Sequence, residues 1–584
     1  MGRAKFEVQV QRDGRWIVEA VVEDEGPAIR EADKILARAN CQAVRVVRDR
    51  LGRETTVYEK DRGGSANGAN VAASAITEAA DCADVEDLYA LPARMTAAKV
   101  LRRWLDANKL TPLETLHNYR ALSRLMDSDP QVYPSAVDRV ATLQAKARGT
   151  DARQRRDELY RLVEEAASRA RRAEGEKAVW KLGLASYAKL CRTAEQVAWV
   201  PQDRALLIRS AVARDLIGQG SYLAKLDVLL ATVTPDLCEE DFGILDEFIA
   251  DVLGSPQTIQ DILGERPNLS AALVALIDIM EGKPPAGRRE PETVAVLRSM
   301  MAEGRLKSAW LVLRDRVVNE VSGARPLSRN DPAKETEAFQ ALVTRLLRFP
   351  RLGTGPQMAE ALTSRCSRQF AEGGKTGLQL AIGTMGGMIA DRSRRVHYYL
   401  DMLKTESGRQ CLPMLGQAIQ MTVMEAADIH AFVRVDESAH EKLAAIGTLQ
   451  RALRGTALPP QLRDALVDRL DTLVARYLVQ ERVIERLDDP TDSLRIRAKR
   501  LVHFVASGLL IEGKAMALAR SRVVEHLKRP NFIEDFTADI KDPTHKETAV
   551  RDFWLMLTTA GFGGTGGKGG GGGDAQPAAA IASS

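Results

Sequence analysis

The feature that most constrains the fold of this chain is a helical spacing of apolar residues that runs from about residue 77 to about residue 560. Apolar side chains recur every three to four residues in nearly every segment, and proline or glycine interrupts the pattern at short intervals. The pattern predicts on the order of twenty helices joined by short turns. Aromatic residues make up only 5% of the chain, which also favours helices over β-sandwiches or barrels.

Successive pairs of these expected helices would suit an α-solenoid, in which each pair buries its apolar face against the next pair. The sequence contains no tetratricopeptide, ankyrin or HEAT consensus. We therefore expect a mainly α protein, built as a large irregular helical array that is either solenoid-like or made of stacked bundles. The longest breaks in the pattern, at 281–291, 322–336 and 350–356, suggest a division into residues 77–349 and 350–561.

A different pattern precedes the array, in residues 1–62. Alternating apolar residues on both sides of Asp13-Gly14 predict a β-hairpin, and helical spacing after Pro27 predicts a short helix. A second alternating pair of segments follows, so we expect a small α+β module of the type ββαββ with its helix on one sheet face. Residues 63–76 have the composition of a flexible linker, and the Gly- and Ala-rich residues 562–584 that of a disordered tail.

The overall charge does not identify a partner. The chain has 584 residues, with 83 Lys and Arg against 79 Asp and Glu, so its formal net charge is only +4. A charge this small for this length does not by itself indicate a nucleic acid or a membrane surface. No apolar run approaches the roughly 18 residues that cross a bilayer, and the N-terminus lacks the pattern of a signal peptide.

The six cysteines are far apart and form no CxxC pair. We therefore expect a cytoplasmic protein whose thiols are reduced and buried. Frequent use of Arg and Ala is typical of a GC-rich bacterial genome.

Familiar catalytic motifs, such as GxSxG and HExxH, are missing from the sequence. The segment 373–376, GGKT, has only the end of a phosphate-binding loop and follows an expected helix instead of a strand, so a helix C-cap and a turn explain it better. Two Glu-x-x-His pairs, Glu114/His117 and Glu437/His440, have the spacing of helical di-iron ligands. Chance accounts for both pairs, and Glu114 also completes a capping box that begins at Thr111. We expect no metal, no cofactor and no catalytic residue.

The most distinctive segment for binding is rich in arginine and tyrosine and follows a glycine- and methionine-rich stretch. Its side chains could present guanidinium donors and stacking faces to an acidic peptide, a phosphate or single-stranded nucleic acid. The alternative is a helix whose arginines lie in solvent or pair with Asp391 and Asp401, with half-buried tyrosines. The candidate binding residues are Arg392, Arg394, Arg395, His397, Tyr398 and Tyr399.

Trp16 of the N-terminal module is a further candidate, either as a core anchor or as a contact residue after the hairpin turn. Basic and acidic residues are nearly balanced in the module. An exposed sheet edge that accepts a partner strand is therefore a more natural use of it than nucleic-acid binding. The alternative is a folded cap that has no separate function.

These observations favour a non-enzymatic cytoplasmic scaffold or adaptor that binds protein partners, with residues 1–62 as a tethered recruitment domain. Two alternatives stay open. One is a nucleic-acid-associated regulator that uses residues 392–399. The other is an enzyme whose site assembles from residues far apart in the sequence.

Overall fold

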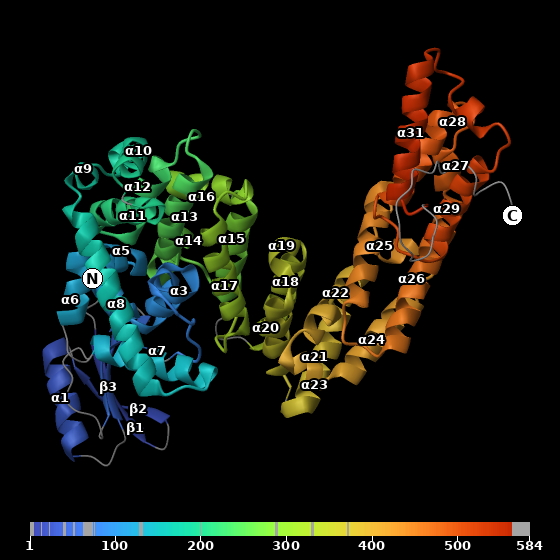
Figure 1. Ribbon diagram of the computed structural model, residues 1–584. Helices are drawn as coiled ribbons and strands as arrows, with labels where there is room; N and C mark the ends of the chain where they lie inside the picture. Colours follow the sequence, from blue (N-terminus) through green and yellow to red (C-terminus); the bar gives the residue numbers. More distant parts are fainter. Residues whose placement is uncertain are drawn as a thin grey trace. The chain divides into compact units, whose positions relative to one another are not determined.

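The computed structural model describes residues 5–12, 15–22, 24–38, 43–50, 53–61, 74, 76–127, 132–198, 200–285, 290–328, 332–370 and 373–562. The described residues form 31 α-helices and a small antiparallel sheet; one helix lies between the second and third strands, and the others follow the sheet (Figure 1). The expected fold class, a mainly helical array preceded by a small α+β module, is confirmed. The expected linker 63–76 and tail 562–584 lie almost entirely outside the described residues. The chain divides into two compact units, Met1–Thr258 and Ile259–Ser584.

The N-terminal module has the expected ββαββ order. Its elements are β1 (Lys5–Arg12), β2 (Arg15–Val22), α1 (Glu25–Arg38), β3 (Ala43–Arg50) and β4 (Arg53–Asp61). All neighbouring strands are antiparallel, and the strand order β2-β1-β3-β4 places β2 and β4 at the two edges. The expected turn at Asp13-Gly14 lies outside the described residues, while Arg12 pairs with Arg15 on either side of it.

The alternation of apolar residues explains which face of the sheet the helix covers. Alternate residues of a strand point to the same face, so the apolar residues of the two central strands gather on one side. Helix α1 packs on that side through two small alanines. The resulting core consists of Phe6, Val8, Val10, Ala28, Ala32, Val44 and Val46.

The helices of the first unit form a bundle in which segments far apart in the sequence pack together. Helix α5 lies at its centre and contacts α3, α6, α8, α11 and α13. The helices are α2 (Val85–Tyr89), α3 (Leu91–Val100), α4 (Arg102–Asn108), α5 (Pro112–His117), α6 (Tyr119–Asp127), α7 (Val132–Arg148), α8 (Ala152–Gly175), α9 (Lys177–Trp180), η1 (Leu184–Ser186), α10 (Tyr187–Val197), α11 (Pro201–Ile217), α12 (Tyr222–Thr232), α13 (Glu239–Leu253) and α14 (Pro256–Leu263), which crosses the unit boundary.

The second unit is organised differently. Among its described residues, the extensive contacts join helices that are at most four places apart in chain order, which is the one-dimensional packing of a solenoid. The helices are α15 (Leu269–Glu281), α16 (Glu292–Ala302), α17 (Lys307–Ser322), α18 (Pro332–Leu347), α19 (Pro350–Gly353), α20 (Pro356–Ser367), α21 (Gly374–Met388), α22 (Arg392–Leu403), α23 (Glu406–Gln410), α24 (Leu412–Met424), η2 (Ile429–Ala431), α25 (Ala439–Arg454), α26 (Pro460–Gln480), α27 (Val483–Leu487), α28 (Leu494–Ala506), α29 (Lys514–Leu527), α30 (Phe532–Phe536) and α31 (Pro543–Thr559).

Three details differ from the sequence expectations. The described array has more helices than the roughly twenty expected. Proline and single cap residues divide stretches in which the spacing of apolar residues predicts one continuous helix. For example, only Leu101 separates α3 from α4. The expected break at 350–356 contains the short helix α19. Cys238, at the N-cap of α13, is exposed, whereas Cys82, Cys191, Cys366 and Cys411 are buried thiols as expected.

The division between residues 349 and 350 lies between α18 and α19, which pack on each other, and it stays a prediction. None of the described helices is long and apolar enough to cross a membrane.

Candidate functional site

Side chains from several surrounding helices hold helix α5 in the centre of the first unit. Thr111 precedes the helix and accepts a hydrogen bond from the Glu114 N–H at 3.3 Å, while Glu114 Oε2 accepts one from the Thr111 N–H at 2.6 Å. This is the capping box that the sequence predicts, with Pro112 at the first helical turn. The box fixes where α5 begins and directs the Glu114 carboxylate into the bundle.

Glu114 also forms a fully buried ion pair. Lys225 Nζ of α12 donates to Glu114 Oε1 at 2.5 Å and to the Lys109 carbonyl at 2.5 Å, and both charged side chains have no exposed surface. Burial raises the pKa of Glu114, and the Lys225 ammonium opposes that rise. Because an isolated charge is costly in this interior, each partner depends on the other.

A second buried pair also contacts the start of α5. Arg94 Nε of α3 is 3.5 Å from Asp251 Oδ1 of α13, and Asp251 Oδ2 accepts a hydrogen bond from the Leu113 N–H at 2.8 Å. Burial raises the pKa of Asp251 to about 6 although the Arg94 charge opposes this. Carboxylates from α5 and α13 thus satisfy N–H groups at the start of α5 that have no partner within the helix.

His117, at the end of α5, is fully buried, and neither of its ring nitrogens has a hydrogen-bond partner in the described part of the chain. Its ring lies 4.5 Å, centroid to centroid, from the ring of Tyr89 in α2. Burial lowers the pKa of His117 well below its usual value, and the positive charges of Arg209 and Arg94 lower it further. The imidazole is therefore neutral at physiological pH.

Neither Glu-x-x-His pair is part of a metal site among the described residues. The described residues contain no group of three or more His, Cys, Asp and Glu side chains that could hold a metal ion. Glu114 is bound to Lys225, and His440 of the second pair is exposed near the start of α25.

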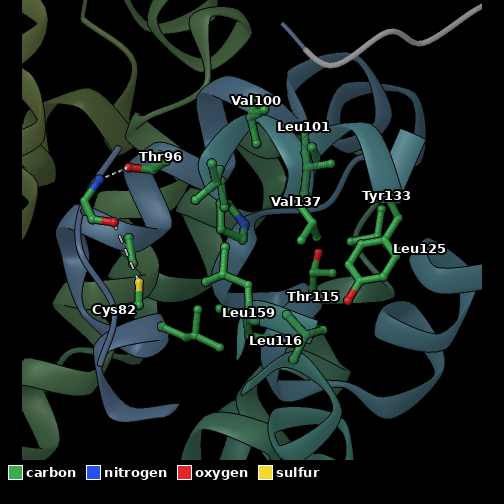
Figure 2. A pocket seen from close by; sticks show the side chains of 18 of the residues that line it. Cys82, Thr96, Val100, Leu101, Thr115, Leu116, Leu125, Tyr133, Val137 and Leu159 are labelled. Carbon is green, nitrogen blue, oxygen red and sulfur yellow. Dashed lines mark hydrogen bonds between the residues drawn. The ribbon is translucent and has the colours of Figure 1, made fainter. Parts of the chain in front are cut away.

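An apolar cavity of about 120 Å³ lies beside α5 in the same unit (Figure 2). Pro112, Thr115 and Leu116 of α5 line it, whereas Glu114 and His117 do not. The other lining residues come mainly from α3, α6, α7 and α8 and are leucine, valine and alanine with few polar exceptions. Helix α5 therefore separates a charged network from an apolar space.

The Arg- and Tyr-rich segment of the sequence forms α22, and its tyrosines are part of the core of the second unit. Tyr398 and Tyr399 are each 6% exposed, and Tyr398 Oη is 2.6 Å from Thr363 Oγ1 of α20. Burial raises the pKa of Tyr399, and the neighbouring Arg395 opposes this. Two rings in this position do not offer the exposed stacking faces that single-stranded nucleic acid needs.

Three of the other candidates in α22 contact backbone carbonyl groups. Arg395 Nε donates to the Ile389 carbonyl at 2.9 Å, Arg394 donates to the Leu347 carbonyl, and His397 Nδ1 lies 2.8 Å from the Ser393 carbonyl oxygen. Arg392 is half-buried. A hollow of about 270 Å³ beside α22 is lined by Arg394, His397 and Tyr398, so three of the six candidate residues share one recess. The role of the segment in binding stays a prediction.

In the N-terminal module, Trp16 belongs to edge strand β2 and pairs with Gln11 of β1. Its side chain lies outside the described part of the structure.

Sequence reasoning missed Lys225, Arg94 and Asp251, since their partners are far away in the chain. A usable signal exists for Lys225 and Asp251, because each charged residue lies among apolar neighbours, in the segments Leu223–Leu226 of α12 and Phe248–Leu253 of α13. A charged residue in such a helix is rarely buried unless it is paired.

Comparison of the chain with protein-family models, with curated proteins and with solved structures finds no match. The function must therefore be argued from the residues themselves.

Proposed function

We propose that this protein is a protein-binding scaffold, in which edge strand β2 of the N-terminal sheet pairs with an extended segment of a partner protein. The observation that carries the proposal is the difference between the two edges of the sheet. An unpaired edge presents backbone N–H and C=O groups, and it attracts another strand unless charges, prolines or bulges protect it.

Strand β2 is eight residues long, and Val18 and Val21 on it are 47% and 56% exposed. Opposite these valines on β1 are Gln9 and Glu7, so the two valines share the sheet face that α1 leaves uncovered. A partner strand beside β2 could bury these valines in addition to pairing with the backbone.

Strand β4, at the other edge, has five charged residues among nine: Arg53, Glu54, Glu59, Lys60 and Asp61. Such an edge resists pairing. The register of β1 and β2 shifts at Val8/Gln9, which leaves Glu19 as an extra residue in β2. The partner strand would therefore pair with the run Arg15–Val18 or with the run Ala20–Val22, on one side of this bulge.

The helical array of the second unit also supports the proposed scaffold function. A solenoid-like array has an extended surface, and several large apolar side chains remain exposed on it. They include Met421, Val435, Val479, Ile533 and Leu555.

The experiment compares three full-length proteins as baits in nuclease-treated lysate of the native cell: the unchanged chain, the variant Val18→Glu/Val21→Lys, and the matched control Thr55→Glu/Thr56→Lys on β4. We expect the β2 variant to lose a defined set of proteins about tenfold, equivalent to about 1.4 kcal/mol, and the β4 control to retain them.

For a partner identified in this way, hydrogen exchange of the Arg15–Val22 amides should slow on binding, because strand addition protects the edge backbone. Equal capture by all three proteins would refute the proposal. Capture that falls steeply with salt and requires the arginines of residues 392–399 would favour the nucleic-acid alternative.

A further inference from the structure

The cavity beside α5 has the properties of a small-molecule site, and this inference is independent of the strand pairing proposed above. We propose that the cavity binds a small apolar molecule of about the size of one six-membered ring, which has a single oxygen that hydrogen-bonds to the hydroxyl of Tyr133.

The size and the lining of the cavity set the ligand class. A volume of about 120 Å³ is similar to the engineered apolar cavity of about 150 Å³ that stays dry and binds benzene. Seven leucines and four valines supply most of the walls. They are Leu88, Leu101, Leu105, Leu116, Leu122, Leu125, Leu159, Val100, Val137, Val140 and Val163. Such walls exclude charged and strongly polar molecules, since these would lose their hydration without replacement.

Most polar side chains that line the cavity are already satisfied. Thr96 Oγ1 donates to the Pro92 carbonyl at 3.0 Å and accepts from the Ala80 N–H at 3.1 Å. Thr115 Oγ1 donates to the Thr111 carbonyl at 2.8 Å. Gln144 Oε1 accepts from Arg155 Nε at 2.8 Å, and Gln144 Nε2 donates to the Ala80 carbonyl. These groups have little to offer to a ligand.

Tyr133 is the exception among the lining residues that the structure describes. Its side chain is 8% exposed, and its buried hydroxyl has no hydrogen-bond partner in that part of the chain. Figure 2 shows the ring beside Leu125, with the hydroxyl turned toward Thr115 and Leu116, which line the same cavity. Tyr160 holds the ring from one side in an edge-on contact at 5.6 Å between centroids.

A buried hydroxyl without a partner costs free energy, and a ligand oxygen placed against it would recover that loss. Burial also keeps the pKa of Tyr133 well above its usual value, so the group stays protonated and can donate. The site should therefore bind a ring that has one hydroxyl group more tightly than the same ring without it.

The test uses benzene and phenol as probes, which differ by one hydroxyl, in calorimetric titrations of the full-length protein. We expect both to bind saturably with one site per chain. In Tyr133→Phe the affinity for phenol should fall about fivefold, as expected for one lost hydrogen bond, while the affinity for benzene changes less than about twofold.

Two variants fill the cavity from two different helices, Ala136→Leu on α7 and Ala97→Leu on α3, so that one variant remains for the test if the other fails to fold. Circular dichroism establishes which variants are folded, and a folded filling variant should bind neither probe.

The proposal is overturned if the unchanged protein binds neither probe saturably, or if a folded filling variant binds both as before. An equal loss of both probes, or of neither, in Tyr133→Phe would overturn the assigned role of the hydroxyl.

Discussion

Lys225 Nζ lies 2.5 Å from Glu114 Oε1, and neither side chain has exposed surface, although 110 residues separate them in the chain. The pair joins α12 to the start of α5, which is the helix that the first unit surrounds. The stability of this unit should therefore depend on a contact that no local pattern shows.

The variant Lys225→Met leaves the Glu114 carboxylate buried without its cation, which should destabilise the unit by about 3–5 kcal/mol. The double variant Lys225→Met/Glu114→Gln should recover a large part of the loss, because the neutral amide can still accept from the Thr111 N–H. Hydrogen exchange of α5 and α12 peptides measures the change for this unit alone. Arg120→Met, which removes a surface ion pair with Glu174 in the same unit, is the control and should cost less than about 1 kcal/mol. Equal effects of Lys225→Met and Arg120→Met would contradict the prediction.

The buried His117 should make the first unit less stable in acid. Its pKa in the folded protein is lowered well below the usual 6.5, so the unfolded chain binds a proton that the folded protein does not. The stability that His117 contributes is present above about pH 6.5 and is lost as the pH falls below it. Below this pH the free energy of unfolding should fall with a slope of up to about 1.4 kcal/mol per pH unit. His117→Phe should remove this slope, as measured by hydrogen exchange of α5. The exposed His440→Gln serves as the control and should leave the slope unchanged.

Asp251 should change the stability of the same unit with pH in the opposite direction. Its pKa is raised to about 6 in the folded protein, so the stability that it contributes is present below about pH 4 and is lost as the pH rises through 6. Asp251→Asn should remove this loss between pH 4 and 6 in the same exchange experiment, with α5 again as the reporter. An unchanged pH profile would show that Asp251 ionises in the folded protein as it does in the unfolded chain.

Two adjacent glycines of α21 should respond oppositely to alanine. A Cβ atom on Gly386 would overlap the hydroxyl of Tyr399, whereas a Cβ on Gly387 would meet no other atom within 4 Å. Gly386→Ala should therefore cost about 1–3 kcal/mol through overpacking, and Gly387→Ala should stabilise the helix by about 0.5–1 kcal/mol. Thermal denaturation of the two variants tests this difference, and a Tm that moves the same way in both would refute it.

Asp488 should be the most sensitive acidic residue near the C-terminal end of the second unit. Its buried carboxylate accepts from Arg497 Nε at 2.7 Å and Arg522 Nε at 2.5 Å, and it lies 2.7 Å from His526 Nε2. These partners lower the pKa of Asp488 despite its burial, so the stability that it contributes is present above about pH 4 and is lost as the pH falls.

Asp488→Ala should destabilise α28 and α29 by more than about 2 kcal/mol at pH 7, because each of these hydrogen bonds involves a charged group. Hydrogen exchange of these two helices checks the effect. Asp464→Ala, which removes a carboxylate that is 71% exposed, is the comparison and should leave their exchange unchanged.

The sequence by itself determined the local structure. Alternation and helical spacing predicted the ββαββ module and the helical array, and Thr111 with Glu114 predicted the start of α5, because strand pleat, helix period and capping depend on residues within a few positions of each other. The packing of helices was decided only by the tertiary structure. It brought Lys225 to Glu114, placed Tyr398 and Tyr399 in the core, left Cys238 exposed and formed the cavity at Tyr133. These features depend on which helix faces meet, and an apolar stripe shows that a face is buried without showing against which helix.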